Sequence, residues 1–303
     1  MIYTITLNPA LDYNLELEKV ELGKLNLSNK AYFLGGGKGI NVSKVLKNLN
    51  IDSIALGFVG GFTGTFIKND LEIRGVKEEF VEVEGSTRIN IKLKENSCES
   101  EIAGLSPQIT EEKIQILFEK LRKITSKDIV VMSGSVPKGI TNKIYLQIME
   151  QLPKGVKVIL DARGEAFKEA LKGKPFLVKP NIHELEEFLE RKINTLEEIV
   201  QGARDIQKCG AQNVVVSMGK DGSILCTEGS IYKGNVPKGV LRNSVGAGDS
   251  MVAGIVAQLA RDKEIAEAYK FGIASGSATA FSYELCTLEE IESLIKEVEV
   301  IKN

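Results

Sequence analysis

Residues 242–257 read RNSVGAGDSMVAGIVA, a glycine-rich turn that runs directly into an apolar stretch. This pattern predicts a turn at residues 246–248 followed by a buried helix. The N-terminus of a helix has unpaired backbone N–H groups and the positive end of the helix dipole, so it favours an anion. Asp249 would then stand as a carboxylate beside a negative ligand. From these residues alone, Asp249 is better explained as a charge that stabilises the helix N-terminus.

The chain before this turn alternates short apolar, β-branched runs with amphipathic stretches. IYTITL (2–7) is followed by GINVSKVLKNLN (39–50), and DIVVMSGS (128–135) is followed by TNKIYLQIMEQL (141–152). Alternation of this kind predicts an α/β fold in which βαβ units surround a mainly parallel sheet. We expect three helices to close the chain, at about residues 247–260, 263–281 and 287–298.

Two segments depart from this alternation. In residues 13–34 and 86–103, polar and apolar side chains alternate, which is typical of strands with one exposed face. We therefore expect one domain over residues 1–303 with a small β-sheet lid, formed by segments at about 12–34 and 85–104. Exposed strands of this kind are marginal by themselves, so we expect the lid to pair with that of a second subunit in a homodimer.

The composition argues against several classes of function. The chain has 39 basic and 41 acidic side chains, so its charge suggests neither a nucleic acid nor a membrane as partner. No apolar stretch reaches the ~20 residues that span a bilayer, and the first residues lack a signal-peptide pattern, so we expect a cytoplasmic protein. Four scattered cysteines and one histidine disfavour disulfide scaffolds, zinc sites and Ser-His-Asp or Cys-His catalysis. Acid and base chemistry must then fall to carboxylates.

A second glycine cluster, GGGKGIN, spans residues 35–41. It is not a Walker A loop, because Lys38 is followed by glycine rather than Ser or Thr, and neither cluster matches the GxGxxG pattern of a dinucleotide site. Gly36 and Gly37 would let the backbone approach a small polar ligand, to which Lys38 and Asn41 would donate hydrogen bonds. A tight turn from strand to helix explains the glycines equally well.

Six motifs occur in an order that resembles the ribokinase-like, or PfkB, family of sugar kinases. They are TLNPALD (6–12), GGGKGINVSKVL (35–46), TRINIKL (87–93), VVMSGSVPKG (130–139), KPNIHELE (179–186) and NSVGAGDSMVAG (243–254). The resemblance spans the chain, and it implies a ribokinase-like three-layer α/β/α fold and the use of ATP with Mg²⁺. The motifs are most similar to the branch of the family that phosphorylates sugar phosphates.

Membership of this branch implies the ATP-dependent phosphorylation of a ketohexose monophosphate, above all of fructose 1-phosphate to fructose 1,6-bisphosphate. Tagatose 6-phosphate and fructose 6-phosphate are the nearest alternative substrates, followed by free sugars and nucleosides. Outside the enzymes, the alternative is a non-catalytic sensor of a sugar phosphate or a nucleotide that has kept the fold.

The resemblance also gives Asp249 a role, as the base that accepts the proton of the acceptor hydroxyl. The backbone N–H groups of Gly246, Ala247 and Gly248 would hold charge on the transferring phosphoryl group. This assignment is physically coherent, because phosphoryl transfer needs positioning and preorganised donors more than covalent chemistry.

For the acceptor sugar, the resemblance implies a set of binding residues around the first strand and the lid. Asp12 would accept hydrogen bonds from sugar hydroxyls, while Arg88 and Lys38 would anchor the phosphate that the sugar already carries. Alternation would place Arg88, Asn90 and Lys92 on one face of their strand. The full set of substrate residues is Asp12, Gly36, Gly37, Lys38, Asn41, Arg88, Asn90 and Ser135.

For the nucleotide, the resemblance implies the residues Lys179, Asn181, Ser217, Gly219 and Gly222. Glu184 would act on magnesium, largely through water, because this ion keeps several waters when it binds proteins. Asn181 and Glu184 also form the pattern of a capping box, which explains both without a ligand. The glycines after Ser217 are likewise explained by a hairpin turn. The adenine is expected near residues 276–285.

Overall fold

The computed structural model describes residues 1–95 and 98–302. Its central sheet has the strand order β15-β14-β13-β12-β11-β10-β9-β1-β4-β5, with β6 paired to the end of β4. Neighbouring strands are parallel from β12 to β5, whereas β13, β14 and β15 are added antiparallel. The bounds are β1 (Ile2–Thr6), β4 (Ser53–Val59), β5 (Lys77–Glu78), β6 (Val81–Glu82), β9 (Ile129–Ser133), β10 (Lys157–Asp161), β11 (Leu177–Val178), β12 (Asn213–Ser217), β13 (Ser223–Cys226), β14 (Ile231–Gly234) and β15 (Val300–Lys302).

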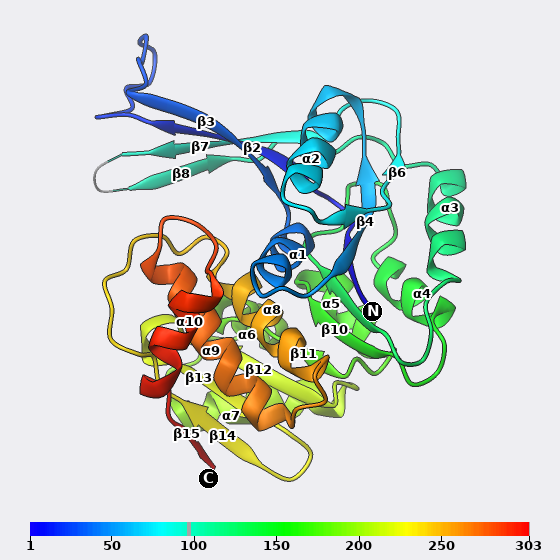
Figure 1. Ribbon diagram of the computed structural model, residues 1–303, viewed down its shortest axis with the longest axis vertical. Coiled ribbons are helices and arrows are strands. Elements are labelled where there is room, and N and C mark those ends of the chain that lie inside the picture. The colour runs from blue at the N-terminus through cyan, green and yellow to red at the C-terminus, as the bar shows by residue number, and fades with distance from the viewer. Residues whose placement is uncertain (96–97, 303) are drawn as a thin grey trace.

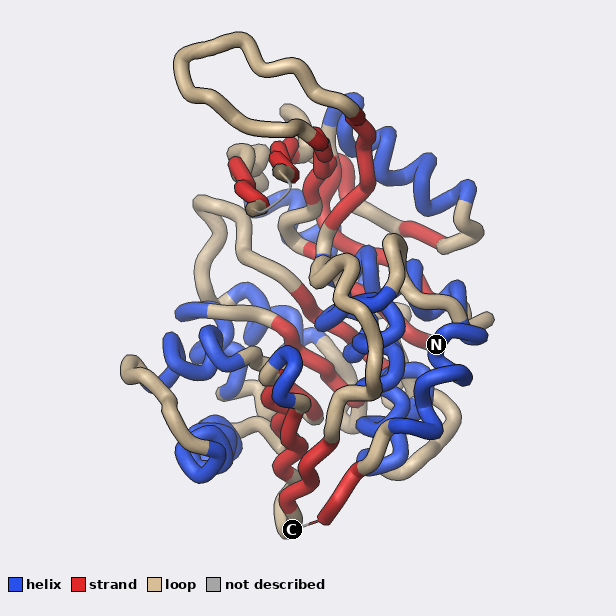
Figure 2. The backbone as a smooth tube through the Cα atoms, turned by 90° about the vertical axis from the view of Figure 1, so that its left-hand side faces the viewer, coloured by secondary structure: helices blue, strands red, loops and turns tan. Residues whose placement is uncertain are grey.

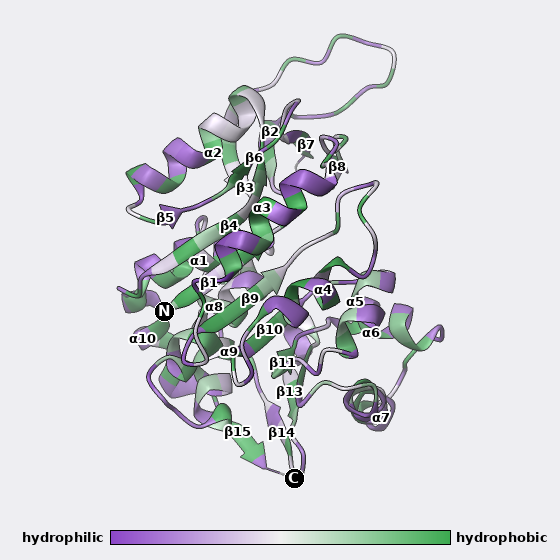
Figure 3. Cartoon of the chain, turned by 90° about the vertical axis from the view of Figure 1, so that its right-hand side faces the viewer, coloured by the Kyte–Doolittle hydropathy of each residue, from purple (hydrophilic) through white to green (hydrophobic). Residues whose placement is uncertain are grey.

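The middle strands are apolar along their whole length because helices cover both faces of the sheet. In β1, Tyr3 and Ile5 pack into one apolar core and Ile2 into another. Helices α3 to α7 supply the first core, and α1, α8, α9 and α10 supply the second. Figure 3 shows the hydrophobic strands between these helix layers. The structure thus confirms the predicted three-layer α/β/α fold.

The helices have the bounds α1 (Lys38–Asn48), α2 (Gly61–Ile73), α3 (Glu111–Leu121), α4 (Ile144–Gln151), α5 (Gly164–Leu171), α6 (Ile182–Leu189), α7 (Leu196–Lys208), α8 (Ala247–Leu259), α9 (Ile265–Phe281) and α10 (Leu288–Leu294). Two short 3₁₀ turns span Gly219–Asp221 and Ile295–Glu297. The helix predicted at about 287–298 therefore ends at Leu294, where the chain changes from α-helical to 3₁₀ geometry. Within the described residues, none of the helices has both the length and the apolar character needed to cross a membrane.

A separate small sheet forms from the two segments that broke the alternation, and we call it the lid sheet. Its strand order is β3-β2-β7-β8, with bounds β2 (Ala10–Glu16), β3 (Lys30–Gly36), β7 (Arg88–Lys94) and β8 (Glu99–Ile102). It projects at the upper left of Figure 1, and the long loop between β2 and β3 extends from the top of the molecule in Figure 2. The predicted small sheet is therefore present. Its strands lie within residues 10–36 and 88–102, whereas the predicted segments were about 12–34 and 85–104. Residues 96 and 97 of the predicted lid segment lie outside the described residues.

The topology brings the motifs to one edge of the central sheet. Strands β1, β9, β10, β11 and β12 run parallel, so their carboxyl ends share this edge. The lid sheet starts from the same edge, since β2 follows β1 after three residues and β3 leads almost directly into α1. Ligands of open α/β sheets bind beyond the carboxyl ends of the strands. The site is therefore expected between this edge and the lid sheet.

Candidate active site

A cleft of about 1100 Å³ opens at this edge, with walls from the central sheet, the lid sheet and α8 and α9. It collects nearly all the residues that the sequence singled out: Asp12, Gly37, Lys38, Asn41, Arg88, Asn90, Lys92, Ser135, Lys179, Asn181, Glu184, Ser217, Gly219, Gly222, Gly246, Ala247, Gly248 and Asp249. Gly36 lies next to it, because a Cβ at this position would be 2.8 Å from Asp12 Oδ2. Motifs from the whole length of the chain thus meet in one place.

Asp249 lies in the first turn of α8, which begins directly after the predicted glycine turn. Gly246 is the N-cap with φ +82°, a left-handed conformation that favours glycine. The Asp249 side chain is buried at 7 % exposure, and Asn41 Nδ2 donates a hydrogen bond of 2.8 Å to its Oδ2. Burial, reinforced by the charge of Asp161, raises the pKa of Asp249 to about 6. The carboxylate is thus poised to accept a proton near neutral pH.

The buried Asp161 pairs with two lysines beside this turn, the buried Lys179 and the partly exposed Lys38. Asp161 Oδ1 lies 2.9 Å from Lys38 Nζ, and its Oδ2 lies 3.6 Å from Lys179 Nζ. Lys179 also lies against the glycine turn, because a Cβ added to Gly248 would be 3.2 Å from Lys179 Nζ. Burial alone would raise the pKa of Asp161, but the charges of Lys179 and Lys38 hold it below its ordinary value. Asp161 is therefore an ionised support for two cations that face the cleft.

Lys38 makes its contacts on the side of the cleft where the Asp249 turn lies. Besides Asp161 it faces Glu184 Oε1 at 3.5 Å. Burial alone would lower the pKa of Lys38, whereas the charges of Asp161, Glu184 and Asp249 raise it. The partners of Lys38 are Asp161 and Glu184, whereas Arg88, with which it is predicted to hold the substrate phosphate, contacts Asn8 and Asn90. That role of Lys38 stays a prediction, and its ion pairs instead favour a place near the Asp249 turn.

On the other side, Asp12 is the centre of a polar group contributed by the lid sheet. Asn90 Nδ2 donates to Asp12 Oδ1 at 2.9 Å, and Lys92 Nζ lies 2.8 Å from Asp12 Oδ2. Arg88 Nη1 donates to Asn90 Oδ1 at 3.3 Å. These contacts confirm that Arg88, Asn90 and Lys92 share one face of β7. They fix the orientation of Asp12, which lies within β2 of the lid sheet and not at the end of the first strand.

Arg88 is tied to the central sheet through Asn8, which the sequence analysis did not single out. Arg88 Nη2 donates to the Asn8 carbonyl oxygen at 3.2 Å, and Asn8 Nδ2 donates to Ser135 Oγ at 3.1 Å. Ser106 Oγ donates to Asn8 Oδ1 at 2.8 Å. Arg88 Nε is buried and has no hydrogen-bond partner among the described residues. Asn8 therefore links the lid sheet to the predicted substrate residue Ser135.

The nucleotide-side residues lie where α6 and the β12–β13 hairpin begin. Asn181 and Glu184 form the capping box predicted for them, through Glu184 N to Asn181 Oδ1 and Asn181 N to Glu184 Oε2, both at 2.9 Å. Gly222 has φ +91°, and a Cβ there would be 2.2 Å from Gly234 O, so the hairpin itself requires this glycine. At Gly219 a Cβ would meet open space, but its φ of +59° is in the left-handed region that also favours glycine. Helix capping thus accounts for Asn181 and Glu184, and the hairpin turn accounts for the glycines, without a ligand.

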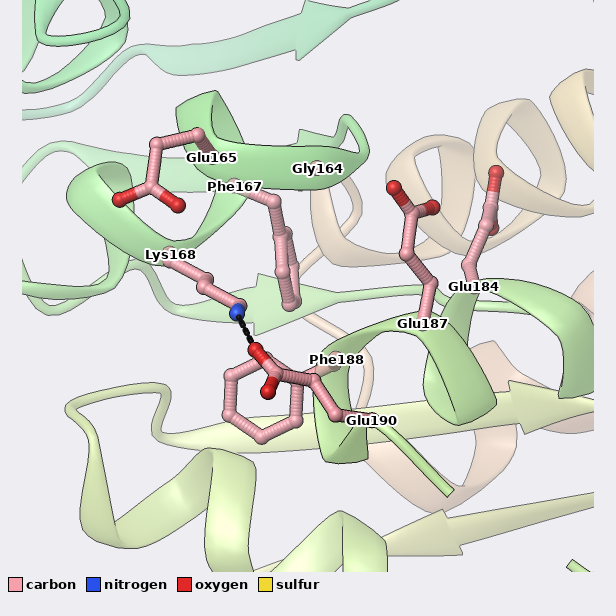
Figure 4. A pocket seen from close by; sticks show the side chains of 8 residues that line it. All are labelled: Gly164, Glu165, Phe167, Lys168, Glu184, Glu187, Phe188 and Glu190. Carbon is pink, nitrogen blue, oxygen red and sulfur yellow. Dashed lines mark hydrogen bonds and ion pairs between the residues drawn. The ribbon is translucent and has the colours of Figure 1, made fainter. Parts of the chain in front are cut away.

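A second pocket of about 230 Å³ lies between α5 and α6. Figure 4 shows Phe167 and Phe188 in it, with Glu184 and Glu187 above and the ion pair of Lys168 with Glu190 below. Glu184 lines both this pocket and the large cleft.

Sequence reasoning missed Asp161 and Asn8, although each carried a readable signal. Asp161 ends the apolar run VKVILD and Asn8 follows IYTITL, so both stand at the carboxyl ends of buried strands, where ligand sites form.

The chain is similar to known carbohydrate kinases along its length. A model of the pfkB family carbohydrate kinases matches residues 6–291. The chain is 46% identical over 303 residues to a 1-phosphofructokinase of Bacillus subtilis, covering 100% of both chains. It is 32% identical over 309 residues to a tagatose-6-phosphate kinase of Staphylococcus epidermidis, again covering 100% of both. The tetrameric inhibited form of phosphofructokinase-2 from Escherichia coli superposes with a TM-score of 0.90 and 30% identity, covering 97% of this chain and 98% of that one.

Proposed function

The chain belongs to the pfkB family of carbohydrate kinases, and we propose that it uses ATP to convert fructose 1-phosphate into fructose 1,6-bisphosphate. The observation that carries this proposal is the buried Asp249 at the N-terminus of α8, held by Asn41 and facing an acceptor side built from Asp12, Asn90 and Arg88. A proton acceptor, an anion-binding turn and a cationic anchor then line one cleft. The 46% identity to a 1-phosphofructokinase favours fructose 1-phosphate among the ketohexose phosphates.

In this proposal Asp249 accepts the proton of the acceptor hydroxyl as that oxygen attacks the terminal phosphorus of ATP. The bond between this phosphorus and the β–γ bridging oxygen breaks, and ADP leaves. The backbone N–H groups at Gly246–Gly248 and the ammonium of Lys179 stabilise the negative charge on the transferring group. Asp12 and Asn41 orient the sugar, and Arg88 holds the phosphate that it already carries.

The nucleotide would lie along the β12–β13 hairpin and α9. Lys179, Asn181, Ser217, Gly219 and Gly222 line this part of the cleft. Gly276, Ser277, Ala280 and Phe281 of α9 also line it, which supports an adenine site near residues 276–285.

The residues present fit a magnesium ion held mainly by phosphates and water. In residues 1–95 and 98–302 no three His, Cys, Asp or Glu side chains gather as ligands. One oxygen of Glu184 caps α6, and the other faces Lys38 and the cleft. Glu184 would therefore act through water, as is usual for this ion. When bound, Mg²⁺ supplies charge neutralisation for the nucleotide phosphates.

We also propose a cytoplasmic homodimer that associates through the lid sheet. Phe33 and Leu34 of β3 and Ile102 of β8 are large apolar side chains that are exposed, and an exposed sheet of this kind favours pairing. Light scattering at micromolar concentration tests this proposal, and a monomer would contradict it.

An ADP-release assay tests the function as a whole. The purified chain is given MgATP with fructose 1-phosphate, fructose 6-phosphate, tagatose 6-phosphate or free fructose. We expect the highest kcat/KM with fructose 1-phosphate. A higher value with either of the other sugar phosphates would reassign the substrate. Binding of nucleotide without turnover of any sugar would instead support a sensor.

A further inference from the structure

Seven basic side chains line the large cleft, and most have a protein partner. Lys38 and Lys179 pair with Asp161, Lys92 pairs with Asp12, and Arg88 donates to Asn8 and Asn90. The other three, for which the described residues provide no ion pair or side-chain hydrogen bond, are Arg163, Lys220 and Lys238.

Two of these three belong to the nucleotide side. Lys220 lies in the hairpin between β12 and β13, and Lys238 lies in the loop after β14. Arg163 instead follows β10, next to the strand that carries Ser135. In the part of the chain that the structure describes, it is therefore the one unpaired cation of the cleft on the acceptor side.

The register of the sheet fixes the position of Arg163 relative to Ser135. Asp161 of β10 pairs with Ser133 of β9, and Gly134 N donates to the Asp161 carbonyl oxygen at 2.9 Å. Arg163 and Ser135 each lie two residues beyond this pair. Neighbouring strands β10, β9 and β1 thus deliver Arg163, Ser135 and Asn8 in that order along the edge, and Asn8 contacts Arg88.

Arg163 has no visible structural role. It is the N-cap residue of α5, but its side chain makes no capping hydrogen bond, and it is exposed. A cation at a helix N-terminus is also opposed by the helix dipole. The pKa of Arg88 indicates that the charge of Arg163 acts on it. Burial lowers the pKa of Arg88, Asp12 and Glu101 act in the opposite sense, and the positive charge of Arg163 adds to the lowering.

We propose that Arg163 is a specificity-determining residue that binds, together with Arg88, the phosphate group already present on the acceptor sugar. This inference rests on the proposed function and deepens it. Arg88 approaches from the lid sheet and has a buried Nε without a partner among the described residues, whereas Arg163 approaches from the central sheet. A phosphate monoester has three terminal oxygens and about two negative charges, so it accepts hydrogen bonds from two guanidinium groups at once. The bound phosphate would bridge the lid sheet and the core.

The test compares the variants Arg163→Ala and Arg163→Lys with the wild-type enzyme. We expect Arg163→Ala to raise the KM for fructose 1-phosphate by about 10–100-fold, the usual loss for charge-assisted hydrogen bonds. The KM for ATP and the rate with free fructose should change less than about twofold, because neither involves the sugar phosphate. Arg163→Lys should recover only part of the affinity, because an ammonium keeps the charge but lacks the planar fork. Inorganic phosphate, as a competitor of fructose 1-phosphate, should inhibit Arg163→Ala more weakly than wild type.

Lys168→Ala is the matched control. Lys168 is on the same short helix as Arg163, but it pairs with Glu190 and lines the second pocket rather than the cleft (Figure 4). Its removal should leave both KM values unchanged. Melting temperatures of all variants check that the fold is intact.

The inference fails if Arg163→Ala keeps its KM for fructose 1-phosphate within about twofold of wild type. It also fails if activity with free fructose falls as much as activity with fructose 1-phosphate. Failure of the proposed function would show in the wild-type enzyme itself. It would then phosphorylate free fructose and no phosphorylated ketohexose in the ADP-release assay.

Discussion

Replacement of Asp249 by Asn tests the catalytic assignment most directly. The variant keeps the size and polarity of the side chain and an oxygen that can accept the hydrogen bond from Asn41, but it cannot take a proton. A positioned general base contributes about 10²–10⁴-fold to a rate. We therefore expect kcat to fall by about 10²–10⁴-fold, which is about 2.7–5.4 kcal/mol of transition-state free energy.

The same substitution should stabilise the fold. The pKa of Asp249 is raised from 3.8 to about 6, so ionising this buried carboxyl costs the folded state about 3 kcal/mol. This cost is absent below pH 3.8, grows as the pH rises towards about 6, and is complete above it. Asp249→Asn removes the charge, so the free energy of unfolding should increase by up to about 3 kcal/mol at pH 7.5 and by little at pH 4.

Three measurements check this prediction. Steady-state kinetics with fructose 1-phosphate give kcat, nucleotide titration gives the affinity for ATP, and urea unfolding at two pH values gives the stability. ATP binding should stay within about twofold of wild type. Asn41→Ala is a useful comparison, because it removes the partner of the carboxylate and leaves the base in place. Retention of more than about a tenth of the wild-type kcat by Asp249→Asn would refute the assignment of Asp249 as the base.

Four further results are expected. Arg88→Ala should raise the KM for fructose 1-phosphate by at least about 10-fold with little change in the KM for ATP, and an equal change in both would assign Arg88 to the fold. Gly246→Ala should lower the free energy of unfolding by about 1–2 kcal/mol and also lower kcat, since φ is +82° and the new Cβ would lie 2.7 Å from Leu285 Cδ2; unchanged values would show that the turn is not restricted to glycine. Asp161→Asn should destabilise the fold by about 3–5 kcal/mol in urea unfolding, because it leaves the buried Lys179 without its carboxylate. Excess EDTA should abolish turnover while leaving the melting temperature of the nucleotide-free protein unchanged, and turnover that persists would contradict the role given to Mg²⁺.

The sequence predicted the fold well because the signals were local and repeated. Apolar runs of β-branched residues alternate with amphipathic stretches, and this pattern is enough to indicate a parallel sheet covered on both faces. The lid sheet was visible for the same reason, since residues 13–34 and 86–103 change from continuous to alternating hydrophobicity. The capping box at Asn181 was readable from a spacing of three residues. The first and last residues of the lid strands differed from the predicted ones, because strand ends depend on tertiary pairing.

The partners of the site residues were not predictable in this way. Lys38 and Asp161 are separated by 123 positions, and they meet only because β10 is placed near the start of α1. The position of Arg163 beside Ser135 depends on the register of β9 with β10, and no local pattern encodes which strands become neighbours. The sequence therefore indicated which residues were chemically suitable, but not which of them pair with one another.

The two buried carboxylates of the cleft illustrate why this matters. Asp161 and Asp249 both follow apolar or glycine-rich motifs, and either residue type is able to accept a proton. Asp161 is paired with Lys179 and Lys38, which hold its pKa below the ordinary value. Asp249 instead accepts a hydrogen bond from the neutral amide of Asn41, and its pKa is raised to about 6. Environments that push the pKa values of two acids apart assign them different roles. Asp161 is too weak a base and serves to hold cations, so the acid limb of the pH–rate profile near pH 6 should belong to Asp249.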